Sequence, residues 1–168
     1  LLSIIFGIVD ENGKRQFREV VLVMARKNGK TLLASAIAKY IWYCGEYGSR
    51  IFCTAPKLDQ ADLVYSSVWQ QTMLDPEWQN LKEEIENSKG GRHEKRQKDD
   101  SELARHRMTD LFIPATNSTV KKVAFSEKKS DGFNPSLCIC DEIASWEGEK
   151  GLKQYEVFKS GMGAREMG

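Results

Sequence analysis

The 168-residue chain is 40% hydrophobic and 29% charged, a balance typical of a globular domain and not of a disordered tail. Its formal net charge of +1 neither requires nor excludes nucleic acid as a partner. Because no apolar run approaches the ~18 residues of a membrane span, and Leu1–Val9 lacks the basic flank of a signal peptide, we expect a soluble, cytoplasmic protein.

The first part of the chain predicts a strand, a turn and a helix. Leu1–Val9 is a short apolar segment that ends at a turn cluster, Asp10–Gly13. Phe17–Met24 is rich in valine and nearly continuously apolar after Glu19, which predicts a central strand covered on both faces. Thr31–Tyr43 then carries apolar residues at helical spacing and predicts a helix.

The alternation of strand and helix continues along the chain. Arg50–Pro56 predicts a second buried strand stopped by proline, and Leu58–Met73 predicts a second helix. A further helix is expected over Asp75–Ile85. This order predicts an α/β fold with a mainly parallel central sheet flanked by helices.

The second half begins with a charged tract, residues 88–108, which contains almost nothing apolar and predicts an exposed, flexible loop. Asp110–Pro114 and Thr119–Phe125 predict two strands that could form a hairpin. A short apolar strand, Leu137–Cys140, and a helix, Leu152–Met162, complete the pattern. We expect a single domain over residues 1–168.

A small basic turn follows Phe17–Met24 and ends in Gly29-Lys30-Thr31. This arrangement is typical of a phosphate-binding loop, in which backbone N–H groups and the start of the next helix surround a phosphate. Lys30 is then expected to reach the terminal phosphates, and Thr31 to bind Mg²⁺ through its hydroxyl. The match is partial because Met24 occupies the place of the first glycine, so an ordinary strand-to-helix turn is the alternative.

Leu137–Cys140 ends in two adjacent carboxylates, Asp141 and Glu142. Nucleotide hydrolysis uses such a pair, because one carboxylate holds the water shell of Mg²⁺ and the next polarises the attacking water. An acidic pair also closes many strands by chance, so a solvated strand end is the alternative. The two motifs occurring together predict nucleotide hydrolysis.

Three segments share a further pattern: Ala25–Thr31, Thr54–Pro56 with Asp59–Ala61, and Asp131–Glu142. Together they resemble the ATPase domain of the large terminase subunit of tailed bacteriophages, whose altered loop also lacks the first glycine and carries a basic residue three positions before the glycine. The resemblance runs from about Phe17 to Gly163. It implies a P-loop NTPase fold and a motor in which ATP hydrolysis, by a ring of subunits, drives double-stranded DNA into a capsid through the portal.

The resemblance also implies roles for single residues. Glu142 and Arg26 become catalytic, with Arg26 near the γ-phosphate, and Thr31 and Asp141 become the Mg²⁺ ligands. The implied nucleotide-binding residues are Arg26, Lys27, Asn28, Gly29, Lys30 and Thr31. For Lys27 a solvent-facing side chain is the preferred interpretation.

Asp59 and Gln60 lie where related DNA translocases contact nucleic acid, and the resemblance makes them candidate DNA contacts. A charge favoured by the helix dipole is the simpler interpretation of Asp59. Lys128, Lys129 and Arg50 are candidates for a contact across subunits.

The implied substrate is ATP, the cofactor Mg²⁺, and the partners double-stranded DNA, a portal protein and a small terminase subunit, in the cytoplasm of a bacterial host. Complete members of the family carry an upstream adenine-contacting segment, a coupling strand and a C-terminal nuclease domain. None is found in this sequence, so we expect a partial ATPase domain, weakly active and without nuclease activity. Two alternatives stay open: a helicase-like P-loop ATPase that acts on nucleic acid, and a nucleotide-binding module without turnover.

Overall fold

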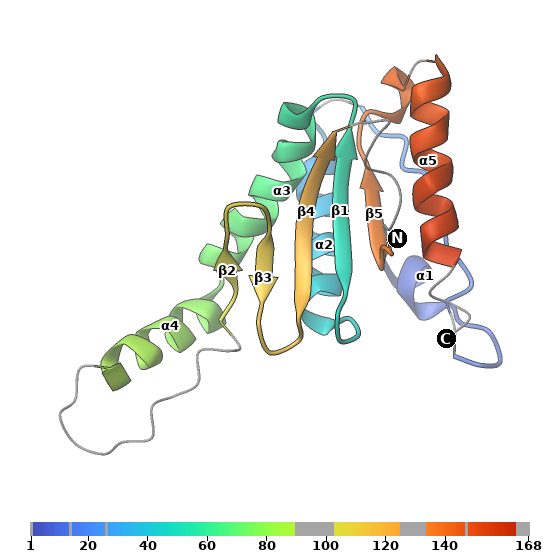
Figure 1. Ribbon diagram of the computed structural model, residues 1–168. Coiled ribbons are helices and arrows are strands. Elements are labelled where there is room, and N and C mark those ends of the chain that lie inside the picture. Colours follow the sequence, from blue (N-terminus) through green and yellow to red (C-terminus); the bar gives the residue numbers. More distant parts are fainter. Residues whose placement is uncertain are drawn as a thin grey trace. The chain divides into compact units, whose positions relative to one another are not determined.

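The computed structural model describes residues 2–13, 15–25, 27–89, 103–124, 134–146 and 148–163 (Figure 1). By their internal contacts, residues group into two compact units, Leu1–Lys30 and Thr31–Gly168. In the described part of the chain, no helix is both long and apolar enough to span a membrane.

The first unit contains one short helix, α1 (Leu2–Gly7), where the sequence showed an apolar segment. An isolated bridge joins Val9 to Arg15. Between them the predicted turn is confirmed, because Asp10 Oδ1 accepts the Asn12 N–H at 2.9 Å.

The strand predicted over Phe17–Met24 is wrong. Residues 17–25 have no strand conformation, and none of the five described strands pairs with them. Val23 is 93% exposed. Strands are stabilised by hydrogen bonds and side-chain packing from a neighbouring strand, so an apolar run without such a neighbour gains neither.

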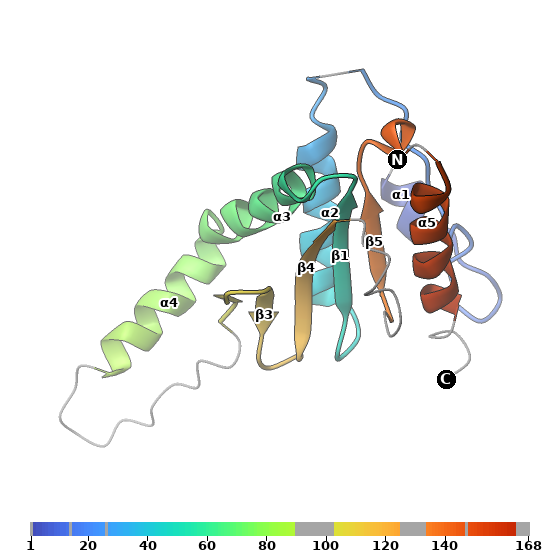
Figure 2. The same ribbon diagram turned by 45° about the horizontal axis from the view of Figure 1, so that its top comes forward.

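The second unit is a five-stranded sheet flanked by helices (Figures 1 and 2). The strands are β1 (Arg50–Ala55), β2 (Arg105–His106), β3 (Leu111–Ile113), β4 (Ser118–Ala124) and β5 (Leu137–Cys140). The helices are α2 (Lys30–Cys44), α3 (Leu58–Met73), α4 (Pro76–Lys89) and α5 (Gly148–Gly163), with a 3₁₀ turn, η1 (Ile143–Ser145). The predicted helices and the strands β1, β3, β4 and β5 are therefore confirmed.

The strands lie in the order β2-β3-β4-β1-β5. The central strand β1 is parallel to both of its neighbours, β4 and β5, whereas β3 is antiparallel to β2 and to β4. The sheet is thus mixed, which corrects the expectation of a mainly parallel one. The predicted hairpin is confirmed, and Asn117 adopts the positive φ of 52° that its tight turn requires.

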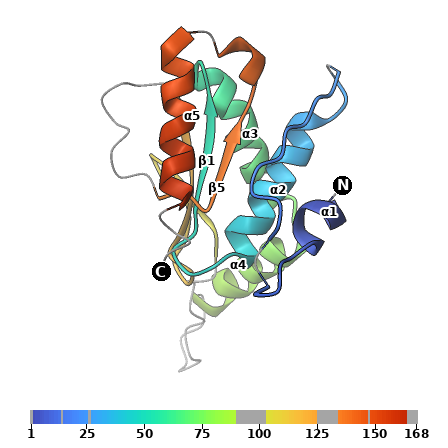
Figure 3. The same cartoon turned by 90° about the vertical axis from the view of Figure 1, so that its right-hand side faces the viewer.

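Helices cover both faces of this sheet: α2 and α3 lie on one side and α5 on the other (Figure 3). On the α5 side the rings of Phe52 and Phe158 lie 5.7 Å apart. On the α2 side Trp42 is fully buried, and its Nε1 donates to the carbonyl of Ser118 at 3.2 Å. The indole of Trp42 therefore links α2 to the first residue of β4.

The charged tract, residues 88–108, is not one loop. Lys89 ends α4, and Arg105–His106 forms β2, while residues 90–102 lie outside the described residues. His106 lies 5.4 Å from the Trp69 ring and 5.8 Å from the Tyr65 ring, measured between centroids. No pattern in the sequence predicts β2, because contacts with α3 and β3 place these two residues and their own composition does not.

Replacement of Trp42 by alanine should cost about 3–5 kcal/mol of unfolding free energy, because it leaves a cavity and removes the hydrogen bond to the Ser118 carbonyl. Urea titration followed by circular dichroism measures the loss. Tyr40, on the same helix and 53% exposed, is the matched control. Equal losses for Trp42→Ala and Tyr40→Ala would contradict this packing role.

Candidate active site

The carboxyl ends of β1 and β5 meet at one edge of the sheet, because the two strands are parallel. The ladder between them continues one residue past β5, where the Asp141 N–H donates to the Thr54 carbonyl at 2.9 Å. Thr54 is itself 1% exposed. The predicted strand ending in an acidic pair is therefore confirmed, and its first carboxylate residue is anchored to the most buried strand.

Glu142 adopts a left-handed backbone conformation, with φ 54° and ψ 38°. In a residue other than glycine this conformation costs on the order of 1–3 kcal/mol and persists only where the surroundings impose it. Here the Glu142 N–H donates to Asp141 Oδ1 at 2.9 Å, and its carbonyl accepts the Ser145 N–H at 2.7 Å. The chain therefore turns sharply at the second carboxylate, and such strain clusters at functional sites.

The turn brings Trp146 back against the strand end. Its indole Nε1 donates to the Asp141 carbonyl at 2.9 Å. Both main-chain polar groups of Asp141 are thus held, the N–H by Thr54 and the carbonyl by Trp146. Sequence reasoning missed both partners, because their contacts arise only from strand register and from the reversal at η1.

Two buried polar atoms near this edge have no hydrogen-bond partner among the described residues: Thr54 Oγ1 and Gln60 Oε1. Gln60 and Asp59 lie in the first turn of α3, which follows β1 directly, so they share the sheet edge of Asp141 and Glu142. Asp59 is exposed and Gln60 is half-buried. Their proposed contact with DNA stays a prediction.

The basic turn of the first unit has positive φ angles at Lys27 (65°) and Gly29 (76°), and the residues from Lys27 to Gly29 are exposed. Lys30 is the first residue of α2 and Thr31 the second, and both are half-buried. The first turn of α2 contains no acidic residue, so its N–H groups present a positive field to an anion. Arg26 lies outside the described residues.

Among the described residues, no three His, Cys, Asp or Glu side chains cluster in a way that could hold a metal ion. Mg²⁺ does not need such a cage. It commonly takes one or two carboxylates and completes its shell with water and substrate phosphates. The hydroxyl of Thr31 and the carboxylate of Asp141 are hard oxygen donors of the kind that fits this ion.

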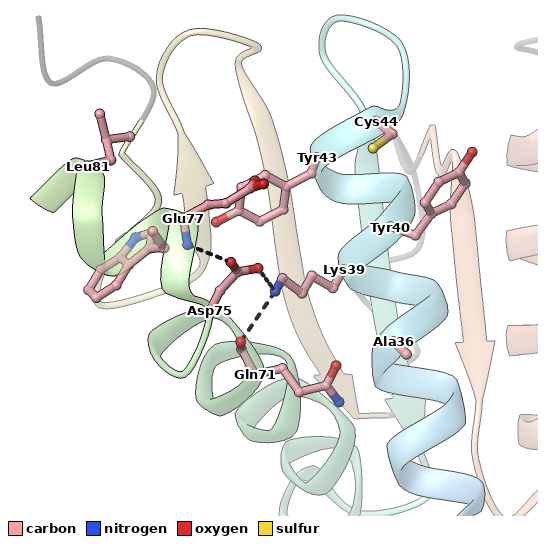
Figure 4. Close-up of a pocket in the computed structure, with 10 residues that line it drawn as sticks. Ala36, Lys39, Tyr40, Tyr43, Cys44, Gln71, Asp75, Glu77 and Leu81 are labelled. Carbon is pink, nitrogen blue, oxygen red and sulfur yellow. Dashed lines mark hydrogen bonds and ion pairs between the residues drawn. The ribbon is translucent and has the colours of Figure 1, made fainter.

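A separate cavity of about 540 Å³ lies between α2 and the junction of α3 with α4 (Figure 4). Within it Lys39 forms an ion pair with Asp75 and donates to the Gln71 carbonyl at 3.3 Å. The hydrogen bond from Lys39 holds the pKa of Asp75 below its usual value. Because Lys39 and Asp75 pair with each other inside it, this cavity is best interpreted as part of the packing between α2 and the α3–α4 junction.

Lys39→Met should lower the unfolding free energy at neutral pH by about 1 kcal/mol, the usual worth of such a partly exposed pair. The pKa of Asp75 is lowered in the folded state, so the stabilisation is complete above its unfolded pKa and is lost as pH falls through the folded one. Urea titrations at several pH values test this. A difference between wild type and variant that persists after Asp75 is protonated would contradict it.

At position 142, glycine should be more stabilising than alanine, by up to about 1 kcal/mol, because only glycine adopts the left-handed conformation without strain. Thermal unfolding of Glu142→Gly and Glu142→Ala measures the difference. Glu156, exposed within α5, is the matched control, where alanine should be more stabilising by about 1 kcal/mol. The same sign at both positions would show that Glu142 is not strained.

The sequence profile of the family "Terminase large subunit, ATPase domain" matches residues 1–167. Among solved structures, the large terminase of bacteriophage HK97 is similar, with a TM-score of 0.61 and 20% sequence identity over 85% of this chain. That likeness shows a shared fold, and the chain spans 26% of the HK97 protein. No curated protein matches the chain.

The match to the family profile includes both the basic turn and the helix after the acidic pair. The family is a P-loop-type ATPase domain, in keeping with the α/β fold and with the motif-bearing strand end at the carboxyl edge of the sheet. The chain therefore belongs to the ATPase-domain family of terminase large subunits.

Proposed function

We propose that this domain hydrolyses ATP with Mg²⁺, and that the hydrolysis powers packaging of double-stranded phage DNA into a capsid. The observation that carries the proposal is the end of β5, where Asp141 is fixed through both main-chain groups and Glu142 is held in a strained turn. Membership in the terminase family supports it. That membership favours the packaging motor over the helicase-like alternative.

In the proposed site the residues from Arg26 to Gly29 surround the phosphates. Lys30 binds the terminal phosphates as a point charge, and Arg26 follows the negative charge that develops during phosphoryl transfer. Thr31 and Asp141 would hold Mg²⁺, which when bound neutralises charge on the phosphate oxygens.

Glu142 is the proposed catalytic base. Its carboxylate would orient the attacking water and accept its proton. General-base catalysis requires the acceptor to stay within hydrogen-bond reach of the water, and the fixed backbone at Glu142 restricts where its side chain can go. In this proposal the backbone strain at Glu142 lowers stability, and it is retained because it positions the catalytic base.

The wider assembly is also a proposal, because the chain spans about a quarter of the HK97 terminase. It comprises a homo-oligomeric ring that docks on a portal protein, receives DNA through a small terminase subunit, and works in the cytoplasm of a bacterial host. Asp59 and Gln60 are retained as candidate DNA contacts. A module that binds nucleotide without turnover is the competing function.

Lys30→Ala and Glu142→Gln should each reduce ATP turnover by at least about 100-fold, since one removes phosphate binding and the other the base. Steady-state phosphate release by the complete protein that carries this domain measures it. Glu142→Gln should keep nucleotide affinity, whereas Lys30→Ala should lose it.

Lys153→Ala is the control, because Lys153 lies on the exposed side of α5 with its side chain 70% exposed. It should keep the wild-type rate. If wild-type protein bound nucleotide but released no phosphate, the domain would be a binding module; unchanged turnover in Glu142→Gln would rule out Glu142 as the base.

A further inference from the structure

Two cysteines lie side by side on β5, directly before the acidic pair. Cys138 and Cys140 are alternate residues of the strand, so their side chains point to the same face of the sheet. Their sulfur atoms are 3.7 Å apart, and neither cysteine forms a disulfide. Both residues are half-buried. The strand therefore holds two thiols in contact, which is the arrangement that a chelating pair of ligands needs.

The face that carries this thiol pair is the one covered by α5. Phe52 is the partner of Cys138 in the ladder between β1 and β5, and residues paired in this way point to the same face. The ring of Phe52 lies 5.7 Å from the ring of Phe158 on α5 (Figure 3). The thiol pair thus has an apolar, aromatic neighbour, and such surroundings strengthen the attraction between thiolates and a cation.

A buried hydroxyl lies beside the same pair. Thr54 is the ladder partner of Cys140, so its side chain points to the same face of the sheet. Thr54 is 1% exposed, and its Oγ1 has no hydrogen-bond partner among the described residues. A buried hydroxyl without a partner is costly and requires an explanation. A thiolate sulfur, or a water molecule on a bound cation, would give this hydroxyl an acceptor.

The geometry of the pair favours a shared cation over a disulfide. Alternate residues of a strand are about 6.6 Å apart, and their parallel Cβ atoms keep about that separation. A disulfide needs Cβ atoms at about 3.5–4.5 Å, so it would require β5 to buckle. The ladder with β1 resists that change. By contrast, two sulfurs bound at ~2.3 Å to one tetrahedral Zn²⁺ lie ~3.8 Å apart, which is close to the observed 3.7 Å.

The two thiols suit a soft cation better than a hard one. Thiolate sulfur is a ligand for ions such as Zn²⁺, whereas Mg²⁺ takes oxygen ligands. Burial raises the pKa of the Cys138 thiol well above its usual value, and Cys140 raises it further. This thiol therefore keeps its proton at neutral pH unless a cation replaces it. A soft cation here and the Mg²⁺ proposed for Thr31 and Asp141 would select different ligands.

We propose that Cys138 and Cys140 together bind one soft divalent cation of the Zn²⁺ class, with the Thr54 hydroxyl as an outer hydrogen-bond donor. Binding forms two bonds between sulfur and the cation, and the two thiol protons leave to solvent. Water completes the coordination, so the site needs fewer protein ligands than the clusters of three that are absent from the described residues. The inference does not rest on ATP hydrolysis.

Titration of the complete protein with Cd²⁺ tests this proposal, because bonds between Cd²⁺ and thiolate sulfur absorb in the ultraviolet. The signal is the difference between wild type and each variant, which removes the contribution of any other thiol. Cys138→Ser and Cys140→Ser should each weaken Cd²⁺ binding at least about 100-fold, more than the loss of an outer partner does. The double variant should lose little more than either single one, because one chelate needs both sulfurs.

The matched control is Cys44→Ser, which removes an exposed cysteine on α2 and should bind Cd²⁺ as wild type does. Thr54→Val keeps the side-chain volume but removes the hydroxyl. It should keep the ultraviolet signal while weakening the affinity by about 10-fold. Excess Mg²⁺, and the variant Asp141→Asn, should leave the titration unchanged. Because serine can disturb packing against α5, each cysteine of the pair is also replaced by alanine, and circular dichroism checks that the variants fold.

A wild-type signal that neither cysteine replacement reduces would overturn the proposal and leave the pair as a packing contact. A disulfide between the two cysteines, in protein that binds no Cd²⁺ after reduction, would make them a redox pair and also overturn it. Loss of the signal in Asp141→Asn would place the cation at the acidic pair, with the same consequence. Protein that hydrolyses ATP but binds no Cd²⁺ at the pair refutes this inference alone. Protein that binds Cd²⁺ there but never hydrolyses ATP refutes the proposed function alone.

Discussion

The pairing of β1 with β5 is the constraint on which the candidate site depends. The pairing extends one residue past β5, where the Thr54 carbonyl accepts the Asp141 N–H. It thereby fixes the position of the Asp141 main chain relative to the end of β1. Because β1 is buried from its second residue onward and lies between two parallel neighbours, it cannot shift without breaking both ladders. A carboxylate attached to such a strand is positioned by the core itself.

The residues beyond this ladder distinguish the end of β5 from an ordinary solvated strand end. Glu142 departs from extended backbone at once, and Trp146 returns to hold the carbonyl of Asp141. A solvated strand end would need neither a left-handed glutamate nor an indole donor. The buried hydroxyl of Thr54, on the neighbouring strand, has no hydrogen-bond partner among the described residues, which is a further local cost at this edge. Local costs of this kind are expected where function, and not stability, selects the residues.

Much of this fold was predictable from the sequence, because its elements carry local signals. The helices α2 and α3 follow apolar spacing, and β1 and β5 are short apolar runs that end at proline and at the acidic pair. The two incorrect predictions also have a physical cause. Phe17–Met24 has the composition of a buried strand but pairs with none of the described strands. Arg105–His106 has the composition of a loop but has two aromatic neighbours and a partner strand. In both cases the presence or absence of a neighbouring strand decides the structure, and a single sequence does not reveal which strands pair.

The residues of the candidate site were in part identifiable from the sequence for the same reason. Lys30, Thr31, Asp141 and Glu142 belong to motifs whose spacing carries their chemistry, whereas Thr54 and Trp146 act through main-chain contacts that have no sequence signature.

We propose that the basic turn and the acidic strand end bind one Mg-nucleotide together. Calorimetric titration of the complete protein with a non-hydrolysable ATP analogue tests it most directly, with and without Mg²⁺, in wild type and in Asp141→Asn. Our proposal predicts heat of binding that depends on Mg²⁺ in the wild type and loses that dependence in the variant. Binding that ignores Mg²⁺ in both proteins, or no binding at all, would contradict it.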